Sequence, residues 1–542
     1  MDFMFLVLSY IRDAAWRIVY MKYAVDSKRM KMIDDYTIDT TKIPAMELME
    51  RAASKLVEVM QQTITKDDRI LAVCGPGNNG GDGVAAGRIL YLQGYHVAIL
   101  FIGEESKCSQ QMQAQLEMAK NLGIPLENSD KLSEYNIIID AIFGVGLSKP
   151  VAGNYEDVIR KLNENHSMVF AVDIPSGISA ENGSIMNAAV KADTTVTFGH
   201  NKIGLLLFPG AEYAGDVIVA DIGFPEEATV NAGLNTFYYE AEDLNRLPKR
   251  KNYSHKGTYG KVLIIAGSRG MAGAACLSAK AAYRSGAGLV KVLTSECNRI
   301  ILQSQLPEAL FAAYDEEDRD AEQNYKQLLS DLAWATVIVV GPGLGLSKTS
   351  KELVETVVRE AKVPIIIDAD AITILSERLN EQDESTVANR LADRLKRLAE
   401  LIPADAILTP HLMELSRLLG GSVSEITNNL IDTTHQCSYN NKLIYAIKDA
   451  RTIVANCDRY YINVSGNQGM ATGGSGDVLT GIIAALAAQG LEPYEAACLG
   501  VYIHGLAGDD AAKQKGSYSM MASDIICSIE KVLINYEYKK QK

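Results

Sequence analysis

Apolar runs of strand length alternate with helical patterns through the first half of the chain. The runs cover residues 70–74, 96–102, 136–142, 168–172, 194–198 and 217–220. Segments with apolar residues at helical spacing lie between them, as at 110–122 and 155–163. Because strands that alternate with helices form βαβ units, this half is predicted to be a doubly wound α/β domain with a parallel sheet.

A second alternating series fills the other half. Its expected strands are residues 261–266, 289–293, 337–340, 364–367, 406–408 and 452–455, and its helices include 274–285, 351–361, 477–489 and 493–513. Residues 225–254, between the two series, are weakly patterned and contain a basic run at 247–252, which we interpret as a solvated linker. We therefore predict two domains, 21–240 and 241–542, that fold independently.

Glycine is concentrated in residues 75–83, directly behind the first apolar run. A strand that breaks into glycine and leads into a helix exposes backbone N–H groups that can hold an anion. The alternative is a tight turn that uses glycine for positive φ. Five glycines, two asparagines and an aspartate in this short segment favour the anion site.

A second glycine-rich segment, residues 469–481, opens an apolar helix at 482–488. Neither segment has the Lys-Ser/Thr ending of a P-loop or the glycine spacing of a dinucleotide fingerprint. The chain is thus expected to have two phosphate-handling sites, each with an aspartate in the loop, Asp82 and Asp477.

Two further aspartates, Asp140 and Asp173, stand at expected strand ends. Ligands of doubly wound sheets bind beyond the carboxyl ends of the strands. A single aspartate in such a place is more often a cap or turn residue, but several polar side chains converging on one rim favour a ligand site. Both halves also contain an Ile-Ile-Ile-Asp strand end, at 137–140 and 365–368, to which we give little functional weight.

Composition narrows the class of protein. The chain has 542 residues, 47% hydrophobic and 22% charged, as expected of a globular protein with more than one domain. A net charge of -14 argues against a nucleic-acid-binding surface, which needs clustered lysine and arginine. The eight cysteines show no C-x-x-C pair and no metal-ligand spacing with histidine, which indicates buried free thiols in a reducing cytoplasm.

The N-terminus is apolar over residues 3–11 and closed by Arg12 and Asp13. It lacks a preceding basic segment and is too short for a membrane span, so neither a signal peptide nor a membrane helix is expected. We interpret residues 1–20 as an optional extension ahead of Met21.

Particular motifs connect the chain to known enzymes. The sequence Gly474-Ser-Gly-Asp477 resembles the anion hole and base of ribokinase-like kinases, and residues 255–268, 270–288, 341–345 and 409–411 are similar to ADP/ATP-dependent NAD(P)H-hydrate dehydratase. Residues 78–82, 143–147 and 173–177 resemble NAD(P)H-hydrate epimerase. The resemblance covers about residues 25–530 and is to the fused bifunctional nicotinamide nucleotide repair family.

That resemblance implies a Rossmann-like epimerase domain followed by a ribokinase-like dehydratase domain. The substrates of the family are reduced nicotinamide cofactors hydrated at C6; the first domain interconverts their R and S forms, and the second restores NAD(P)H from the S form at the expense of ADP or ATP, with Mg²⁺. A potassium ion is implied in the epimerase domain. A cytoplasmic homo-oligomer that binds neither nucleic acid nor membrane is expected.

The resemblance also assigns residues. In the epimerase half it implies Asp173 as the catalytic residue, with oxygen ligands for potassium from Asn79, Asp140 and Ser176. The hydrated cofactor would contact Asn78, Asn79, Gly80, Gly81, Asp82, Gly144, Val145, Gly146, Leu147, Ser148, Lys149, Pro150 and Asp173. In the dehydratase half Asp477 would be the base, with Ala275, Gly343 and His411 at the substrate and Lys448, Asp449, Ala450, Arg451, Thr452 and Gly476 at the nucleotide.

Two departures from the family pattern and two rival functions stay open. Thr-Pro-His is followed by Leu412-Met413 where the family has a glycine before the glutamate, and Asp449 replaces glycine after Lys448. His411 has an alternative interpretation as a packed or capping residue. The rivals are a kinase of a small alcohol with an accessory N-terminal domain, and an N-terminal scaffold with an inactive site.

Overall fold

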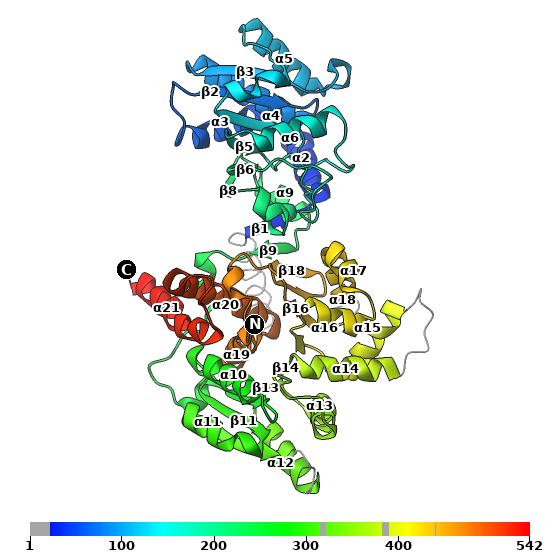
Figure 1. The fold of residues 1–542 in the computed structure, drawn as a ribbon, viewed down its shortest axis with the longest axis vertical. Helices are drawn as coiled ribbons and strands as arrows, with labels where there is room; N and C mark the ends of the chain where they lie inside the picture. The colour runs from blue at the N-terminus through cyan, green and yellow to red at the C-terminus, as the bar shows by residue number, and fades with distance from the viewer. Residues whose placement is uncertain (1–21, 315–320, 382–389, 440, 542) are drawn as a thin grey trace, which may run out of the picture. The chain divides into compact units, whose positions relative to one another are not determined.

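The computed structural model describes residues 22–314, 321–381, 390–439 and 441–541 (Figure 1). These residues form two compact units that divide between Phe237 and Tyr238. The predicted boundary lies three residues later, between residues 240 and 241.

The first unit contains a six-stranded sheet in which all strands are parallel, as the alternating pattern predicts. The strand order is β3-β2-β4-β5-β6-β8. The strands are β2 (Arg69–Cys74), β3 (His96–Phe101), β4 (Ile137–Ala141), β5 (Met168–Val172), β6 (Thr194–Phe198) and β8 (Asp216–Ala220).

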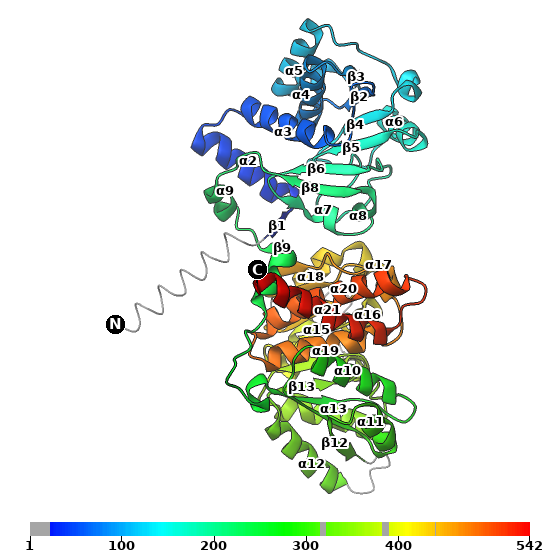
Figure 2. The same ribbon diagram turned by 90° about the vertical axis from the view of Figure 1, so that its left-hand side faces the viewer.

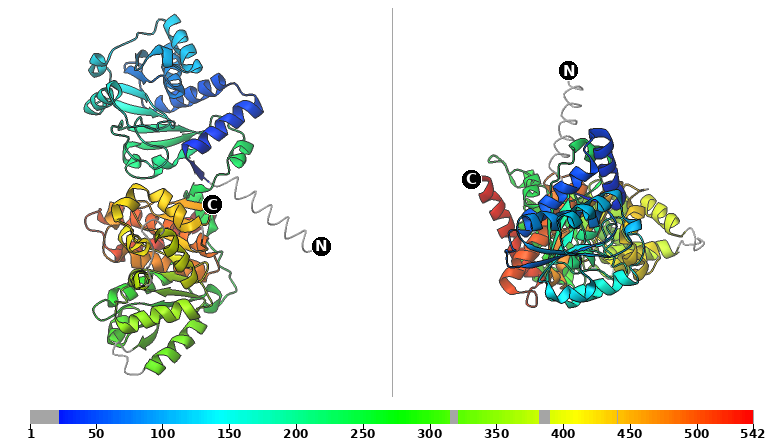
Figure 3. Two further views of the ribbon diagram at one scale, coloured as in Figure 1. Left: turned by 90° about the vertical axis from the view of Figure 1, so that its right-hand side faces the viewer. Right: turned by 90° about the horizontal axis from the view of Figure 1, so that it is seen from above.

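Helices cover both faces of this sheet (Figure 2). On one face lie α3 (Ala45–Met60), α4 (Asn78–Leu92) and α5 (Gln110–Asn121), and on the other lies α6 (Asn154–Glu164). The left view of Figure 3 shows the same layers from the opposite side, with α3 in blue. The unit also contains α2 (Ser27–Thr41), α7 (Ile203–Leu206), α8 (Gly210–Tyr213), α9 (Glu226–Asn231) and a short parallel pair, β1 (Lys22–Val25) with β7 (Asn201–Lys202).

The first glycine-rich segment is mostly helix, which differs from the loop that we expected. Helix α4 already begins at Asn78, and none of the glycines from Gly75 to Gly83 has a positive φ. A Cβ on Gly80 would lie 1.9 Å from the carbonyl oxygen of Gly75, and one on Gly83 would lie 2.4 Å from the Cβ of Ala141. These glycines therefore let the first turns of α4 approach the preceding loop and β4 closely.

The second unit contains a larger sheet. Its order runs β12-β11-β10-β13-β14-β15-β16-β17-β18, parallel as far as β16 and antiparallel after it. The predicted strands are present as β10 (Lys261–Ile265), β11 (Leu289–Ser295), β13 (Val337–Val340), β14 (Ile365–Ile367), β15 (Ile407–Leu408) and β17 (Ile453–Asn456). Three further strands were not predicted: β12 (Leu310–Tyr314), β16 (Ile444–Ile447) and β18 (Arg459–Ile462).

Helices cover both faces of this sheet as well (Figure 1). On one face are α10 (Ala272–Arg284), α19 (Ser475–Ala488), α20 (Pro493–Lys515) and α21 (Ala522–Gln541). The opposite core is formed with α12 (Ala321–Trp334), α13 (Lys348–Glu360), α14 (Asp370–Glu381), α15 (Arg390–Leu401) and α16 (Leu412–Leu419). Shorter helices are α11 (Arg299–Gln305), α17 (Val423–Asn428) and α18 (Leu430–Tyr439). Because α19 is apolar on nearly every side, it is buried beneath α10 and α20.

The linker prediction is wrong for part of residues 225–254. This stretch includes β9 (Thr236–Tyr238) and a 3₁₀ turn at Ala241–Arg246. The ring of Tyr239 is buried in the second unit, with its centroid 4.6 Å from that of Tyr461 and 5.9 Å from that of Tyr502. Packing among these three tyrosine rings thus holds the start of the second unit in place.

All eight cysteines are free, as expected. The expectation that they are buried is wrong for Cys297, Cys457 and Cys527, which are exposed. Among the described residues, no helix is long and apolar enough to cross a membrane. The proposed extension at residues 1–20 lies outside the described residues.

Candidate active sites

A cavity of about 1080 Å³ lies in the first unit at the carboxyl ends of the strands. Most of the predicted epimerase residues line it: Asn78, Asn79, Asp82, Gly144, Val145, Gly146, Leu147, Ser148, Lys149 and Asp173. Gly80, Gly81 and Pro150 are not part of its lining. The two glycines are buried inside α4, where they serve close packing.

Asp173 follows β5 and has a positive φ of 65°, a strained conformation for a residue with a side chain. Its carboxylate accepts hydrogen bonds from Thr197 Oγ1 and the backbone N–H of Phe198, both at 3.1 Å. Lys202 Nζ lies 2.5 Å from the same oxygen and donates to the carbonyl oxygens of Phe198 and His200. Since the Lys202 side chain is 1% exposed and that of Asp173 is 13% exposed, the ion pair is buried.

Two more carboxyl groups face this ion pair from helices. Burial raises the pKa of Asp34, on α2, to about 7; the negative charge of Asp173 adds to the shift and Lys202 opposes it. Burial also holds the pKa of Asp82 well above its usual range, with further contributions from Asp173 and Asp34. Burial, together with the nearby charge of Asp173, thus favours the protonated forms of Asp34 and Asp82.

Asp34 and Lys202 were missed by the sequence analysis. Both line the cavity. From sequence alone, an aspartate of a helix such as α2 that faces a ligand site looks the same as one that faces solvent. The strand that contains Lys202 is only two residues long. Their proximity to Asp173 follows from tertiary structure alone.

Asp140 and Ser176, two of the predicted potassium ligands, are in direct contact. Ser176 Oγ donates to Asp140 Oδ1 at 2.6 Å, and its backbone N–H donates to Oδ2 at 2.8 Å. Burial raises the pKa of Asp140 to about 6 against the opposing effect of these hydrogen bonds. The third predicted ligand, Asn79, has a buried side-chain amide nitrogen without a hydrogen-bond partner among the described residues.

In the second unit the glycine-rich segment ends at the N-terminus of α19. Gly474, with φ 87°, caps this helix without a side-chain hydrogen bond, which leaves first-turn N–H groups able to face a ligand. Asp477 lies in that first turn, and Ser278 Oγ on α10 donates to its carbonyl oxygen at 2.9 Å. Burial raises the pKa of the Asp477 carboxyl to about 7; Asp368 and Asp370 add to the shift and Lys448 opposes it.

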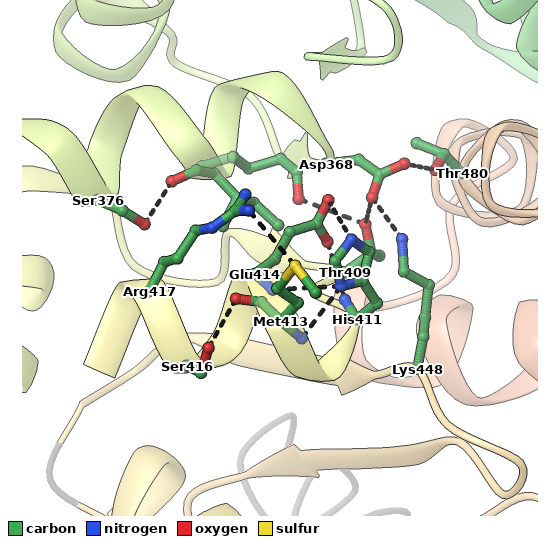
Figure 4. Close-up of polar contacts among 12 residues, drawn as sticks. Asp368, Ser376, Thr409, His411, Met413, Glu414, Ser416, Arg417, Lys448 and Thr480 are labelled. Atoms are coloured by element: carbon green, nitrogen blue, oxygen red, sulfur yellow. Dashed lines mark hydrogen bonds and ion pairs between the residues drawn. The ribbon is translucent and has the colours of Figure 1, made fainter. Parts of the chain in front are cut away.

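A buried aspartate, Asp368, connects this helix to the strand ends (Figure 4). Its Oδ1 accepts from Thr409 Oγ1 at 2.8 Å and pairs with Lys448 Nζ at 2.7 Å, and its Oδ2 accepts from Thr480 Oγ1 on α19 at 2.9 Å. Asp368 ends the second Ile-Ile-Ile-Asp run, to which we gave little weight. Both runs place a buried aspartate that hydrogen-bonds a hydroxyl from the next strand end.

His411 caps α16. Its ring Nδ1 accepts from the backbone N–H groups of Met413 and Glu414 at 3.1 and 3.2 Å. The backbone N–H of His411 donates to Glu414 Oε2 at 2.8 Å. The capping alternative is therefore correct as a structural description, and the half-exposed ring keeps an open side. The Met413 side chain is exposed, with its sulfur 3.3 Å from Arg417 Nη2 (Figure 4).

Five of the six predicted nucleotide residues, Lys448–Thr452, form the turn between β16 and β17, and the sixth, Gly476, lies in the first turn of α19. A Cβ on Gly476 would lie 3.3 Å from Lys448 Nζ. Because glycine has no side chain, the Lys448 ammonium can lie close to the start of α19. Asp449 and Ala450 are exposed, whereas Arg451 donates to the carbonyl oxygen of Val464 and the carbonyl of Thr452 accepts from Asn463.

The two remaining dehydratase residues lie at α10. The Ala275 side chain is completely buried, and a Cβ on Gly267 would lie 3.1 Å from that of Ala275. Gly343, with φ 56°, lies against the start of the helix, because a Cβ there would be 2.9 Å from that of Ala274.

Comparison with known proteins defines the class of each unit. A family model described as NAD(P)H-hydrate dehydratase matches residues 262–531, and one described as YjeF-related protein N-terminus matches residues 45–204. The second unit also resembles the crystal structure of the ADP/ATP-dependent NAD(P)H-hydrate dehydratase from Bacillus subtilis co-crystallized with ATP/Mg²⁺. Identity is 26%, coverage is 55% of this chain and 98% of that chain, and the TM-score is 0.45. The family models thus define the second unit as a dehydratase-type domain and the first as a YjeF-related N-terminal domain.

Relatives match nearly the whole chain. The bifunctional NAD(P)H-hydrate repair enzyme Nnr of Thermofilum pendens is 35% identical over 519 residues, which cover 93% of this chain and 95% of the relative. The enzyme of the same name from Moorella thermoacetica is 35% identical over 534 residues, covering 95% and 97%. The chain belongs to the family of bifunctional NAD(P)H-hydrate repair enzymes.

Proposed function

We propose that the chain repairs hydrated nicotinamide cofactors. The first unit interconverts the R and S forms of NAD(P)H hydrate, and the second restores NAD(P)H from the S form at the expense of ADP or ATP. The observation that carries this proposal is the presence of two separate polar sites, around Asp173 and Asp477, within a chain that matches bifunctional repair enzymes over nearly its full length.

In the first unit Asp173 acts on the hydrated ring. The cavity around it takes a ligand of cofactor size, and the buried Lys202 holds the carboxylate in place. Asn78, Asn79 and the residues from Gly144 to Lys149 line the same space and contact the ligand.

A potassium ion fits the neighbouring residues. Asp140 and Ser176 supply a carboxylate and a hydroxyl within hydrogen-bond distance, and Asn79, which lines the cavity, would contribute its amide oxygen. Oxygen-only ligands suit a hard cation. Among the described residues no cluster of three His, Cys, Asp or Glu side chains is placed to hold a metal, which disfavours a transition-metal site there. Bound potassium would supply positive charge beside the cavity.

In the second unit Asp477 is the general base. It removes the proton from the C6 hydroxyl, whose oxygen attacks the terminal phosphorus of the nucleotide and displaces AMP from ADP, or ADP from ATP. The lone pair of the ring nitrogen then expels the phosphate from C6, and loss of a C5 proton completes the double bond. The first-turn N–H groups of α19 and Lys448 stabilise charge on the transferred phosphoryl group, and Asp368 positions Lys448.

The two departures from the family pattern have mild consequences in this arrangement. Both side chains, Asp449 and Met413, are exposed to solvent. We propose that Asp449 weakens nucleotide binding modestly through its negative charge, and that Met413 changes packing around the open side of His411 without removing it.

Product analysis tests the proposal against the small-alcohol kinase. The protein is incubated with S hydrate and ADP or ATP, and phosphate is measured together with the dihydronicotinamide absorbance. Stoichiometric phosphate release with return of absorbance supports repair, whereas a stable phosphorylated product supports the kinase. A cytoplasmic location and a homo-oligomeric state stay predictions, which fractionation and light scattering test.

A further inference from the structure

Asp34 stands apart from the other carboxyl groups of the first cavity. It projects from α2, outside residues 45–204 matched by the family model described as YjeF-related protein N-terminus. Asp173 has Lys202, Thr197 and a backbone N–H as partners. In contrast, the Asp34 carboxyl group makes no hydrogen bond or ion pair with any residue in the described ranges, although it lines the same cavity. A carboxyl group without protein partners is available to a ligand.

We infer that Asp34 is the general acid of the epimerisation, working with Asp173 as the base; this rests on the proposed epimerase function. In the hydrated ring C6 carries a hydroxyl group and is bonded to N1. Asp173 takes the hydroxyl proton, the C6–O bond becomes a carbonyl, and the C6–N1 electron pair moves to N1, which takes a proton from Asp34. Rotation about C5–C6 and closure by the reverse proton transfers give the other epimer. The reaction needs no further reactant.

The charges around the cavity support this division of roles. Asp173 is paired with a buried ammonium, whereas burial and the charge of Asp173 raise the pKa of Asp34 to about 7. The other charged groups lining the cavity are Lys28, Lys31, Asp35, Asp82 and Lys149. Because its pKa is raised to about 7, the Asp34 carboxyl keeps a proton near neutral pH, whereas the Asp173 carboxylate faces the Lys202 ammonium. One acid and one base are thus present together near neutral pH.

Asp82 is the competing acid. Its pKa is raised as well, through burial first. It lies in the second turn of α4, behind Asn78 and Asn79, in the segment that the family resemblance assigns to holding the substrate. The test therefore compares the two carboxyl groups directly.

The experiment measures kcat/KM for R-to-S conversion by chromatography between pH 5.5 and 9 for the full chain. The variants are Asp34→Asn, Asp34→Glu and Asp82→Asn. Asp39→Asn is the matched control, because it neutralises an exposed carboxylate of the same helix that does not line the cavity. Thermal unfolding and dehydration of pure S hydrate in the same preparations verify folding.

We expect wild-type epimerisation to fall as the pH rises through about 7, since Asp34 then loses its proton. Asp34→Asn should lower the rate by about 10²-fold or more and abolish this fall. Asp34→Glu and Asp39→Asn should keep the fall of the rate with rising pH. A rate within threefold of wild type and an unchanged pH profile in Asp34→Asn overturn the inference, and so does loss of the fall in Asp82→Asn alone. Wild-type protein without epimerase activity would instead contradict the proposed function itself.

Discussion

Lys448 Nζ and Asp368 Oδ1 form an ion pair of 2.7 Å, although strand β15 lies between the two strands that these residues follow. Asp368 follows β14 and Lys448 follows β16, and the intervening strand β15 leads to Thr409, which donates to the same carboxylate. The pair thus ties three strand ends together beside the N-terminus of α19. The Asp368 side chain is almost entirely buried, with 2% of its surface exposed.

Asp368→Asn should impair dehydration and stability together. Removing one partner of a buried pair leaves the Lys448 ammonium without its counter-charge, which costs roughly 3 kcal/mol in the free energy of unfolding. We also expect a dehydration rate at least about 10-fold lower, because Lys448 loses its position. Denaturant unfolding and steady-state kinetics measure both effects. Glu377→Gln, which breaks the exposed pair with Lys351, is the control and should change stability by less than about 1 kcal/mol. Equal effects of the two variants would refute the positioning role.

Asp477→Asn should stop nucleotide-dependent dehydration, with a loss of about 10²-fold or more, and leave epimerisation intact. It should also stabilise the protein at alkaline pH. Since the pKa of this carboxyl rises from 3.8 to about 7 on folding, the folded chain binds the extra proton and loses stability as the pH rises between these values.

The amide carries no such charge, so the variant should exceed wild type by about 1–3 kcal/mol at pH 8 and match it near pH 4. Urea unfolding at the two pH values measures the difference. A gain that is the same at both pH values would show that Asp477 is not the titrating group.

Asp173→Ala should stop R-to-S conversion and spare dehydration of pure S hydrate. It should also destabilise the first unit, because Lys202 is 1% exposed and would lose its partner. Asp173→Asn tolerates the positive φ better than alanine does and keeps a hydrogen-bond acceptor, so it should recover part of the stability but none of the epimerase activity. Thermal unfolding and chromatographic assay separate the two properties. If the Asp173→Asn variant equilibrates R and S at the wild-type rate, Asp173 has only a structural role.

The domain boundary is testable with fragments. We propose that residues 21–237 and 238–542, expressed separately, fold and retain epimerase and dehydratase activity respectively. A fragment that begins at residue 241 lacks Tyr239, whose ring packs against Tyr461 and Tyr502, and should unfold at a lower temperature. Tyr253→Ala in the longer fragment is the control, since this ring is 99% exposed. If the fragments beginning at 238 and 241 melt together, Tyr239 does not contribute to the second unit.

The parallel strands were predictable because their sequences are apolar without interruption. Strands such as β2 and β13 are buried on both faces, and such a run is typical of a parallel sheet. β12 was missed because it is partly exposed and its burial pattern is weak. β16 and β18 were missed because they mix tyrosine or arginine with their apolar residues, and so short a mixed run does not identify a strand.

The candidate sites were predictable only where a local motif marks them. Asp477 and Asp173 follow from glycine-rich or strand-end patterns. Lys202, Asp34 and Asp368 gain their roles from partners more than 20 residues away in the chain, as in the ion pair of Lys202 with Asp173. Charge and burial at such positions depend on the packing of several elements, which spacing in a single sequence does not contain.

The most direct test of the account uses an equilibrated mixture of R and S hydrates with ADP or ATP and follows the return of the dihydronicotinamide absorbance. Wild-type protein should restore the absorbance of both epimers, because the first unit feeds the second. Asp173→Asn should stop at the S fraction, and adding Asp477→Asn protein should let it continue to completion. Recovery of the R fraction by Asp173→Asn alone, or no recovery by wild-type protein, would contradict the assignment of the two reactions to the two units.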